Sequence, residues 1–102
     1  MENLRQLSSF FNAIDSDPRI SITHIGIYAA LLQYWKVHDF ENPMCVFSYE
    51  IMKIAKISAS ATYHKCIRDL NDFGYLKYEA SFKRNKGSHI YLHSNDKNFR
   101  ND

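Results

Sequence analysis

The chain has 102 residues, of which 45% are hydrophobic and 24% are charged, and its formal net charge at pH 7 is +2. These values are typical of a single globular domain and exclude the low hydrophobicity of a disordered chain. No apolar run approaches the roughly 20 residues that a bilayer requires, and residues 1–10, MENLRQLSSF, lack the cationic start and apolar stretch of a signal peptide. We therefore expect a cytoplasmic protein that does not bind a membrane.

Residues 1–16 are expected to form an N-terminal amphipathic helix. Its hydrophobic residues recur at spacings of three and four, and they are Leu4, Leu7, Phe10, Phe11 and Ile14. Pro18 disfavours helical angles at Asp17 and so ends the element. This hydrophobic stripe has two interpretations: it covers the core of its own domain, or it forms a homodimer through residues 4–14.

The run SITHIGIYAALLQYWKVHDF predicts a second helix that begins at Ser21 or Thr23. Its expected apolar face comprises Ile25, Tyr28, Leu31, Leu32 and Trp35. Gly26 costs such a helix about 1 kcal/mol relative to alanine, which indicates a close approach by another backbone. After Pro43, the residues MCVF at 44–47 predict a short buried strand.

Two further helices are expected, separated by a short turn. The first, over YEIMKIAKI, is capped by Ser48 and stops near Ile57. Its expected inward residues are Ile51, Ile54 and Ala55. The second, over SASATYHKCIRDLNDFGY, begins at Ser58 or Ser60 and ends at Gly74, because a left-handed glycine commonly terminates a helix.

From residue 75 the hydrophobic period changes from 3.6 to 2, which predicts a strand. The residues KRNKG then predict a turn, since Asn85 and Gly87 can take positive φ. The run SHIYLH predicts a second strand with Ile90 and Leu92 on one face. Three cations gather at the tip of this hairpin, although the net charge of the chain is only +2: Lys83, Arg84 and Lys86.

The predicted element order is that of a winged helix-turn-helix domain. This is an α+β fold with three core helices plus a small antiparallel sheet with a basic wing hairpin, here with an extra N-terminal helix. The chain then divides into the N-terminal helix at 1–16, a winged helix domain at 19–93 and a polar tail at 94–102. In this architecture the third core helix enters the DNA major groove and the wing lies along the neighbouring backbone. The charges suit such a partner, because residues 1–58 carry five cations and six anions, whereas residues 59–93 carry six cations and three anions.

The third core helix separates into two faces at about 100 degrees per residue. The face expected to pack on the other helices comprises Ala59, Tyr63, Cys66, Ile67, Leu70, Phe73 and Gly74. The outer face comprises Ala61, His64, Lys65, Arg68 and Asp72. Candidate DNA contacts on this helix are Ser60, Ala61, Thr62, His64, Lys65 and Arg68. Lys65 and Arg68 are the leading candidates, and an arginine can bond guanine O6 and N7 together. The hydroxyl groups of Ser60 and Thr62, at the helix N-terminus, suit a phosphate.

The candidate contacts in the wing are Lys83, Arg84, Asn85 and Lys86. A cationic tip releases counterions from phosphates and adds affinity without reading sequence. Each group also has a simpler interpretation: Lys65 and Arg68 form a solvated face in which Arg68 pairs with Asp72, and the basic tip keeps an edge strand soluble. Double-stranded DNA is favoured because both groups lie on the elements that this architecture directs at one duplex.

Other chemistries find less support. Single-stranded nucleic acid would stack on tyrosines, and the candidates are Tyr63, Tyr75, Tyr78 and Tyr91, but Tyr63 falls on the packed face. No metal site is expected, since His89 and His93 lie about 13 Å apart along a strand. Cys45 and Cys66 are expected to be buried reduced thiols. No catalytic constellation, cofactor motif or small-molecule site stands out, so we predict no enzyme.

The segment KISASATYHKCIRDLNDFGYL resembles the second half of bacterial winged-helix regulators, with Leu70, Gly74, Tyr75 and Leu76 at the matching positions. Three stretches, DPRISITHIGIYAALLQYW, TYHKCIRDLNDFGYL and KGSHIYL, resemble more narrowly a family of small helix-turn-helix proteins carried on conjugative and mobilisable elements of anaerobic gut bacteria. The resemblance covers residues 14–92 and implies DNA binding in transcriptional regulation, or in the replication or transfer of a mobile element. The rival class is a protein-interaction module, because winged helices also serve as assembly surfaces.

Overall fold

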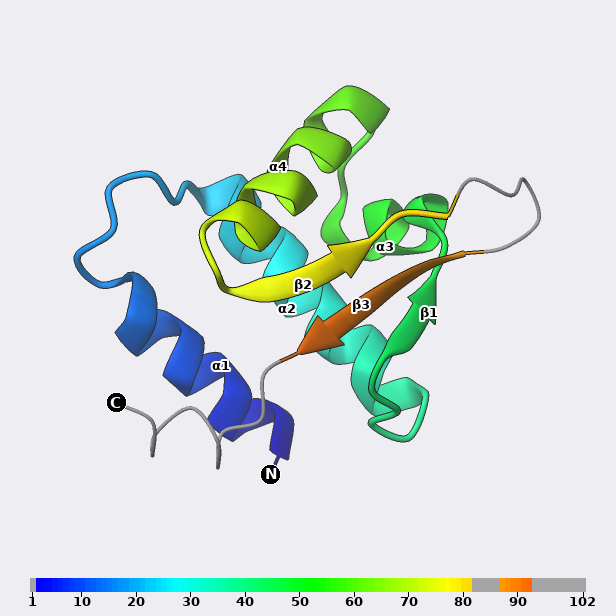
Figure 1. Ribbon diagram of the computed structural model, residues 1–102, viewed down its shortest axis with the longest axis horizontal. Helices are drawn as coiled ribbons and strands as arrows, with labels where there is room; N and C mark the ends of the chain where they lie inside the picture. The colour runs from blue at the N-terminus through cyan, green and yellow to red at the C-terminus, as the bar shows by residue number, and fades with distance from the viewer. Residues whose placement is uncertain (1, 82–86, 93–102) are drawn as a thin grey trace.

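The computed structural model describes residues 2–81 and 87–92, and Figure 1 shows how their helices and strands are arranged. The elements in chain order are α1 (Glu2–Ile14), α2 (Ile22–Val37), β1 (Met44–Val46), α3 (Ser48–Ala55), α4 (Ser60–Asp72), β2 (Leu76–Glu79) and β3 (Ser88–Leu92). Four helices and a small antiparallel sheet in these ranges confirm the expected α+β class. Every helix described is too short or too polar to span a bilayer.

The sheet has the strand order β1-β3-β2, so that β3 lies in the middle and pairs antiparallel with both neighbours. Ile90 and Leu92 of β3 are both buried, as their alternation predicted. Asn42 joins the preceding loop to this strand, because its Nδ2 donates to the Leu92 carbonyl over 2.8 Å and its Oδ1 accepts from the Leu92 N–H over 3.1 Å. Gly87 leaves no room for a Cβ, which would lie 2.5 Å from the Val46 carbonyl oxygen. This close approach, rather than a positive φ, explains the glycine.

α2 packs against α1, α3 and α4 and so lies at the centre of the helices (Figure 1). Ser21 is its N-cap, one of the two residues expected there. The prediction that another backbone approaches Gly26 is wrong, since no atom lies within 4 Å of a Cβ built at that position. The described side chains with no exposed surface come from α2, α3, α4 and β3, and they are Ile27, Leu31, Ile51, Ile67, Leu70 and Ile90.

The predicted starts of α3 and α4 need correction. Phe47 and Ala59 have extended backbone angles, and their carbonyl groups accept the first helical hydrogen bonds, so they are the N-caps. The serines predicted as caps are therefore not caps: Ser48, Ser58 and Ser60. Ile54 was expected to face inward but is exposed, because the short α3 fully buries only Ile51.

α1 packs on α2 through one side of its hydrophobic stripe. Phe10 stacks on Tyr28 with ring centroids 3.9 Å apart, and Gln6 Nε2 donates to the Tyr28 hydroxyl over 3.2 Å. Phe10 is buried, whereas Leu4 is 59% exposed and Phe11 is 44% exposed. α1 therefore covers the core of its own domain with part of the stripe and leaves the rest at the surface.

Candidate functional site

α4 separates into a buried side and an exposed side, as its periodicity predicted. The buried residues are Tyr63, Cys66, Ile67 and Leu70. From the predicted contact set, His64 is half-buried and the exposed residues are Ser60, Ala61, Thr62, Lys65 and Arg68. Three residues assigned to the packed face are not buried, because they lie at the ends of the helix: Ala59, Phe73 and Gly74. Gly74 has a φ of 90°, so the left-handed glycine expected at the helix end is confirmed.

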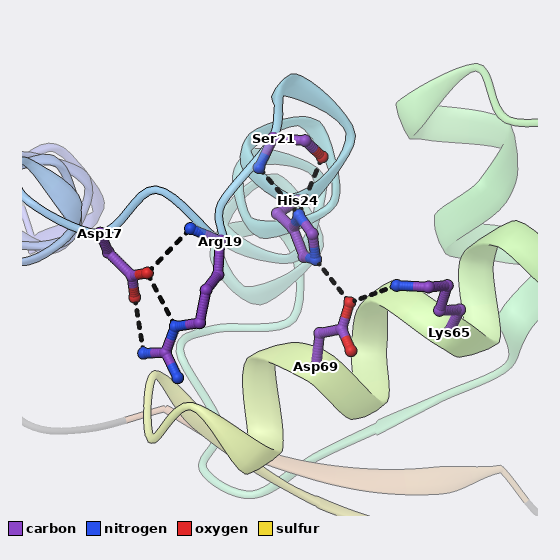
Figure 2. Close-up of polar contacts among 6 residues, drawn as sticks. All are labelled: Asp17, Arg19, Ser21, His24, Lys65 and Asp69. Carbon is purple, nitrogen blue, oxygen red and sulfur yellow. Dashed lines mark hydrogen bonds and ion pairs between the residues drawn. The ribbon is translucent and has the colours of Figure 1, made fainter.

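Lys65 is held by an acidic side chain of its own helix. Its Nζ lies 2.9 Å from Asp69 Oδ2, in an ion pair between residues i and i+4. The same carboxylate oxygen lies 2.9 Å from Nε2 of His24 on α2 (Figure 2). The hydrogen bond from His24, and after it the one from Lys65, hold the pKa of Asp69 below its ordinary value of 3.8. Asp69 in turn raises the pKa of Lys65.

Arg68 is the second cation on the outer side of α4. It is exposed, and it has no hydrogen bond or ion pair among the residues described. The alternative in which Arg68 pairs with Asp72 is not found, since Asp72 Oδ1 instead accepts from Asn71 Nδ2 over 3.1 Å. His64 Nδ1 lies 3.0 Å from the Ser60 carbonyl oxygen, so this ring nitrogen donates to the first residue of the helix.

His24 is a buried ring whose two nitrogens have different partners. The backbone N–H of Ser21 donates to Nδ1 over 2.9 Å, and Ser21 Oγ lies 2.8 Å from the same atom (Figure 2). A backbone amide can only donate, so Nδ1 carries a lone pair and the ring proton sits on Nε2, from which it is donated to Asp69. The neutral imidazole therefore links the start of α2 to the middle of α4.

Cys66 completes a group of three potential metal ligands that the sequence did not reveal, because His24 lies far from the other two along the chain. The Cys66 Sγ, the His24 ring and the Asp69 carboxylate have ligand atoms within 4.8 Å of one another. Zn²⁺ takes ligands of these types. Burial raises the pKa of the Cys66 thiol, however, and coordination through Nε2 would move the ring proton to Nδ1, where it would face the Ser21 N–H. The hydrogen bonds thus fit a structural link between two helices better than a metal centre.

A second carboxylate, Asp17, connects the α1–α2 loop to the residues that follow α4. The Arg19 guanidinium bonds both of its oxygens over 2.8 Å, and the Arg19 backbone N–H donates to Oδ1 over 3.0 Å. The Tyr75 hydroxyl also donates to Asp17, and the Arg19 guanidinium lies 3.9 Å from the centre of the Phe73 ring. These bonds, above all those from the Arg19 side chain, hold the pKa of Asp17 far below its usual range. The arrangement fixes the C-terminal end of α4 to the loop.

The predicted wing contacts fall outside the described residues, and they are Lys83, Arg84, Asn85 and Lys86. Their hairpin is described as far as Ser81 and again from Gly87. Lys56 is an exposed cation in the turn before α4, with a left-handed φ of 63°. Its position directly before the predicted contact helix was the signal that could have added it to the candidate set.

Cys45 and the four candidate stacking tyrosines bear on two further expectations. Both cysteines are free thiols, but only Cys66 is buried; the prediction that Cys45 is buried is wrong, because the middle residue of β1 faces outward. The tyrosines considered for base stacking do not form an open platform, since Tyr63 is buried and the other three are half-buried. Single-strand stacking therefore gains no support from the described surface.

Comparison with known proteins leaves the function open. No family model matches this chain, and no curated protein and no solved structure matches it either. The most distinctive surface of the chain is the outer side of α4, with one cation held by a carboxylate and one without a partner in the described part of the chain.

Proposed function

We propose that this chain is a winged helix-turn-helix protein that binds double-stranded DNA, with α4 as the recognition helix and the β2–β3 hairpin as the wing. The order of the helices, the short turn between α3 and α4 and the strand order β1-β3-β2 support this assignment. The observation that carries it is the surface of α4, which exposes Lys65 and Arg68 while its opposite side is buried. The role that the sequence resemblance implies is transcriptional regulation, or assistance in the replication or transfer of a mobile element.

Arg68 is the base reader in this proposal. It can bond guanine O6 and N7 without first breaking an ion pair to another described residue, and such a contact discriminates by roughly 1 to 3 kcal/mol. Ala61 is small enough for close contact with a thymine methyl group. Ser60 and Thr62 place hydroxyl groups beside the free backbone N–H groups of the first helical turn, where a phosphate is favoured.

The wing adds affinity that does not depend on sequence. In Figure 1, β2 runs toward the side of the molecule on which α4 begins, and β3 returns from that side. The connection between these strands contains Lys83, Arg84, Asn85 and Lys86, and its three cations would release counterions on meeting phosphates. Lys56, the exposed C-cap residue of α3, adds a further positive charge four residues before α4 begins.

Fluorescence anisotropy with a labelled duplex of random sequence, at about 50 and about 200 mM salt, tests the proposal. We expect a complex that weakens steeply with salt. Replacing Lys83, Arg84 and Lys86 together by alanine should flatten the slope of log affinity against log salt by about 0.9 per lost contact. Arg5→Ala is a single-charge control, since it removes an exposed cation from α1, and it should leave the slope unchanged. An unchanged slope in the triple variant would refute the wing role, and a wild-type protein with no salt-sensitive complex would refute DNA binding.

The reading role of Arg68 needs a preferred sequence, which selection of bound fragments from a randomised duplex pool provides. Arg68→Ala should relax the preference at one base pair and weaken binding to the selected duplex by roughly 1 to 3 kcal/mol. Its affinity for random duplex should fall less. Equal losses on selected and random DNA would exclude Arg68 as a reader.

A protein-interaction module is the second candidate, and one feature of the surface favours it. An open hollow of about 230 Å³ is lined by Leu4, Leu7, Ala29, Leu32 and Gln33 of α1 and α2. Leu4 and Phe11 are exposed on the same helix, which would suit a homodimer through residues 4–14. Sedimentation of the wild type and of Leu4→Glu tests this candidate: a dimer that the substitution dissociates supports it, and a monomeric wild type contradicts it.

A further inference from the structure

The exposed side of α4 carries two cations in different states. Lys65 Nζ lies 2.9 Å from Asp69 Oδ2, whereas Arg68 has no partner among the residues described. Lys65 and Arg68 are three positions apart on one helix, so a duplex that meets this side of α4 meets both side chains. Lys65 would meet a phosphate while paired with the Asp69 carboxylate, whereas Arg68 has no such pair within the described ranges.

On its side facing α2, Asp69 accepts a buried hydrogen bond. His24 is 5% exposed, and its Nε2–H donates to the same oxygen that accepts from Lys65. The other ring nitrogen accepts from the backbone N–H of Ser21, so the imidazole cannot turn without losing that bond. Asp69 therefore cannot follow Lys65 away from the helix. A phosphate that contacts Lys65 has to compete with the Asp69 carboxylate. That carboxylate stays beside Lys65 and repels the phosphate.

We propose that Asp69 limits the non-specific DNA affinity of this protein by holding Lys65 away from phosphates. The inference rests on the proposed DNA-binding function and gives Asp69 a positioning role within it. Specificity commonly needs an element that weakens binding to the wrong partner as well as one that binds the right partner. Here the fixed carboxylate is the repulsive element, and Arg68 is left as the cation that contacts bases.

Two carboxylates of α4 supply a matched pair of variants. Asp69→Asn removes the charge that holds Lys65, but asparagine Oδ1 still accepts from His24 Nε2–H, so the link between α2 and α4 is kept. Asp72→Asn removes an equal charge from the same exposed side, where the carboxylate holds no cation and accepts only from Asn71 among the described residues. The difference between the two variants separates the release of Lys65 from the simple loss of a negative charge.

The measurement is affinity for a random-sequence duplex at about 50 and about 200 mM salt, for each variant with and without Lys65→Ala. One additional phosphate contact steepens the salt slope by about 0.9. Asp69→Asn should therefore bind more tightly than the wild type at the lower salt, and lose a further factor of about 3 to 4 over this range. Asp72→Asn should leave the slope unchanged, and Lys65→Ala should abolish the additional slope of Asp69→Asn.

Equal slopes for Asp69→Asn and Asp72→Asn, or an additional slope that survives Lys65→Ala, would overturn the inference while leaving DNA binding in place. A wild-type protein without any salt-sensitive complex would overturn the proposed function, and the inference with it. Thermal unfolding shows whether Asp69→Asn is folded. If it is not, the single variant Lys65→Ala decides: it should leave the wild-type slope nearly unchanged, and a slope flattened by about 0.9 would overturn the inference.

Discussion

Asp17 and Asp69 both connect the segment around α4 to the N-terminal half of the chain, but their donors lie in different places. Asp17 is bonded on both oxygens by Arg19, in the loop between α1 and α2. Asp69 receives one buried donor, His24, and one exposed donor, Lys65, through a single oxygen. Figure 2 shows the two arrangements side by side, at the start of α2 and along α4.

The two carboxylates have pKa values shifted in the same direction, although they differ in what they can do. Both pKa values are lowered, because each anion accepts several hydrogen bonds from cationic or N–H donors. A lowered pKa therefore does not by itself distinguish a structural carboxylate from one at a candidate binding surface. The location of the donors does: of the two carboxylates, Asp69 is the one that holds a cation on the outer side of α4.

The largest effect on stability is expected from His24→Ala. This substitution leaves a cavity between α2 and α4 and removes the buried donor to Asp69, so the free energy of unfolding should fall by about 2 to 4 kcal/mol. Urea denaturation measures it. Arg19→Ala is the corresponding change at Asp17 and should cost clearly less, because the Arg19 side chain is 55% exposed. If Arg19→Ala lowers the unfolding free energy as much as His24→Ala does, the buried bond from His24 is not the stronger of the two links.

Lowering the pH should reveal a further difference between the two carboxylates, in the pH at which each stops contributing to stability. Because each folded-state pKa is lowered, the stability that each anion contributes is fully present above the ordinary value of 3.8 and is lost as pH falls through the folded-state pKa. The pKa of Asp17 is lowered further than that of Asp69. The difference in unfolding free energy between the wild type and Asp17→Asn should therefore persist to lower pH than the difference for Asp69→Asn.

Urea unfolding of the wild type and both asparagine variants, from neutral pH down through the acid range, provides this test. Lys65 and Arg19 keep their charge over the whole range. If the Asp17→Asn difference in unfolding free energy disappears at a higher pH than the Asp69→Asn difference, the pKa of Asp17 is not the lower of the two.

The helices and the sheet could be predicted from the sequence because burial imposes a spacing on hydrophobic residues. The period of 3.6 in α4 and of 2 in β3 correctly placed their buried residues, such as Ile67 and Ile90. Glycine was harder to interpret, because its role depends on distant neighbours. Gly26 has open space around it, whereas Gly87 lies against the Val46 carbonyl of a strand far away in the chain.

The ion pair on α4 could not be predicted from local spacing. Lys65 with Asp69, and Arg68 with Asp72, have the same separation and the same order of charges, so the helix alone does not favour one pair. The structure forms the first pair, and His24 holds its carboxylate from another helix. Long-range contacts of this kind leave no periodic signal, which is why the outer side of α4 was predicted but the pairing of Lys65 with Asp69 was not.

The smallest effects are expected from two tyrosine hydroxyls near α4. The Tyr75 hydroxyl donates to Asp17, whereas the Tyr63 hydroxyl has no hydrogen-bond partner within the described ranges although its residue is 1% exposed. Tyr75→Phe should lower the unfolding free energy by about 1 kcal/mol, since the carboxylate loses a donor. Tyr63→Phe should leave it unchanged or raise it by up to about 1 kcal/mol, since an unpaired buried polar group is removed. Urea denaturation of both variants measures whether a hydroxyl with a partner and one without a partner differ in their contribution to stability. If Tyr63→Phe is destabilised as much as Tyr75→Phe, the Tyr63 hydroxyl stabilises the fold as a bonded one does, and its description as unpaired is contradicted.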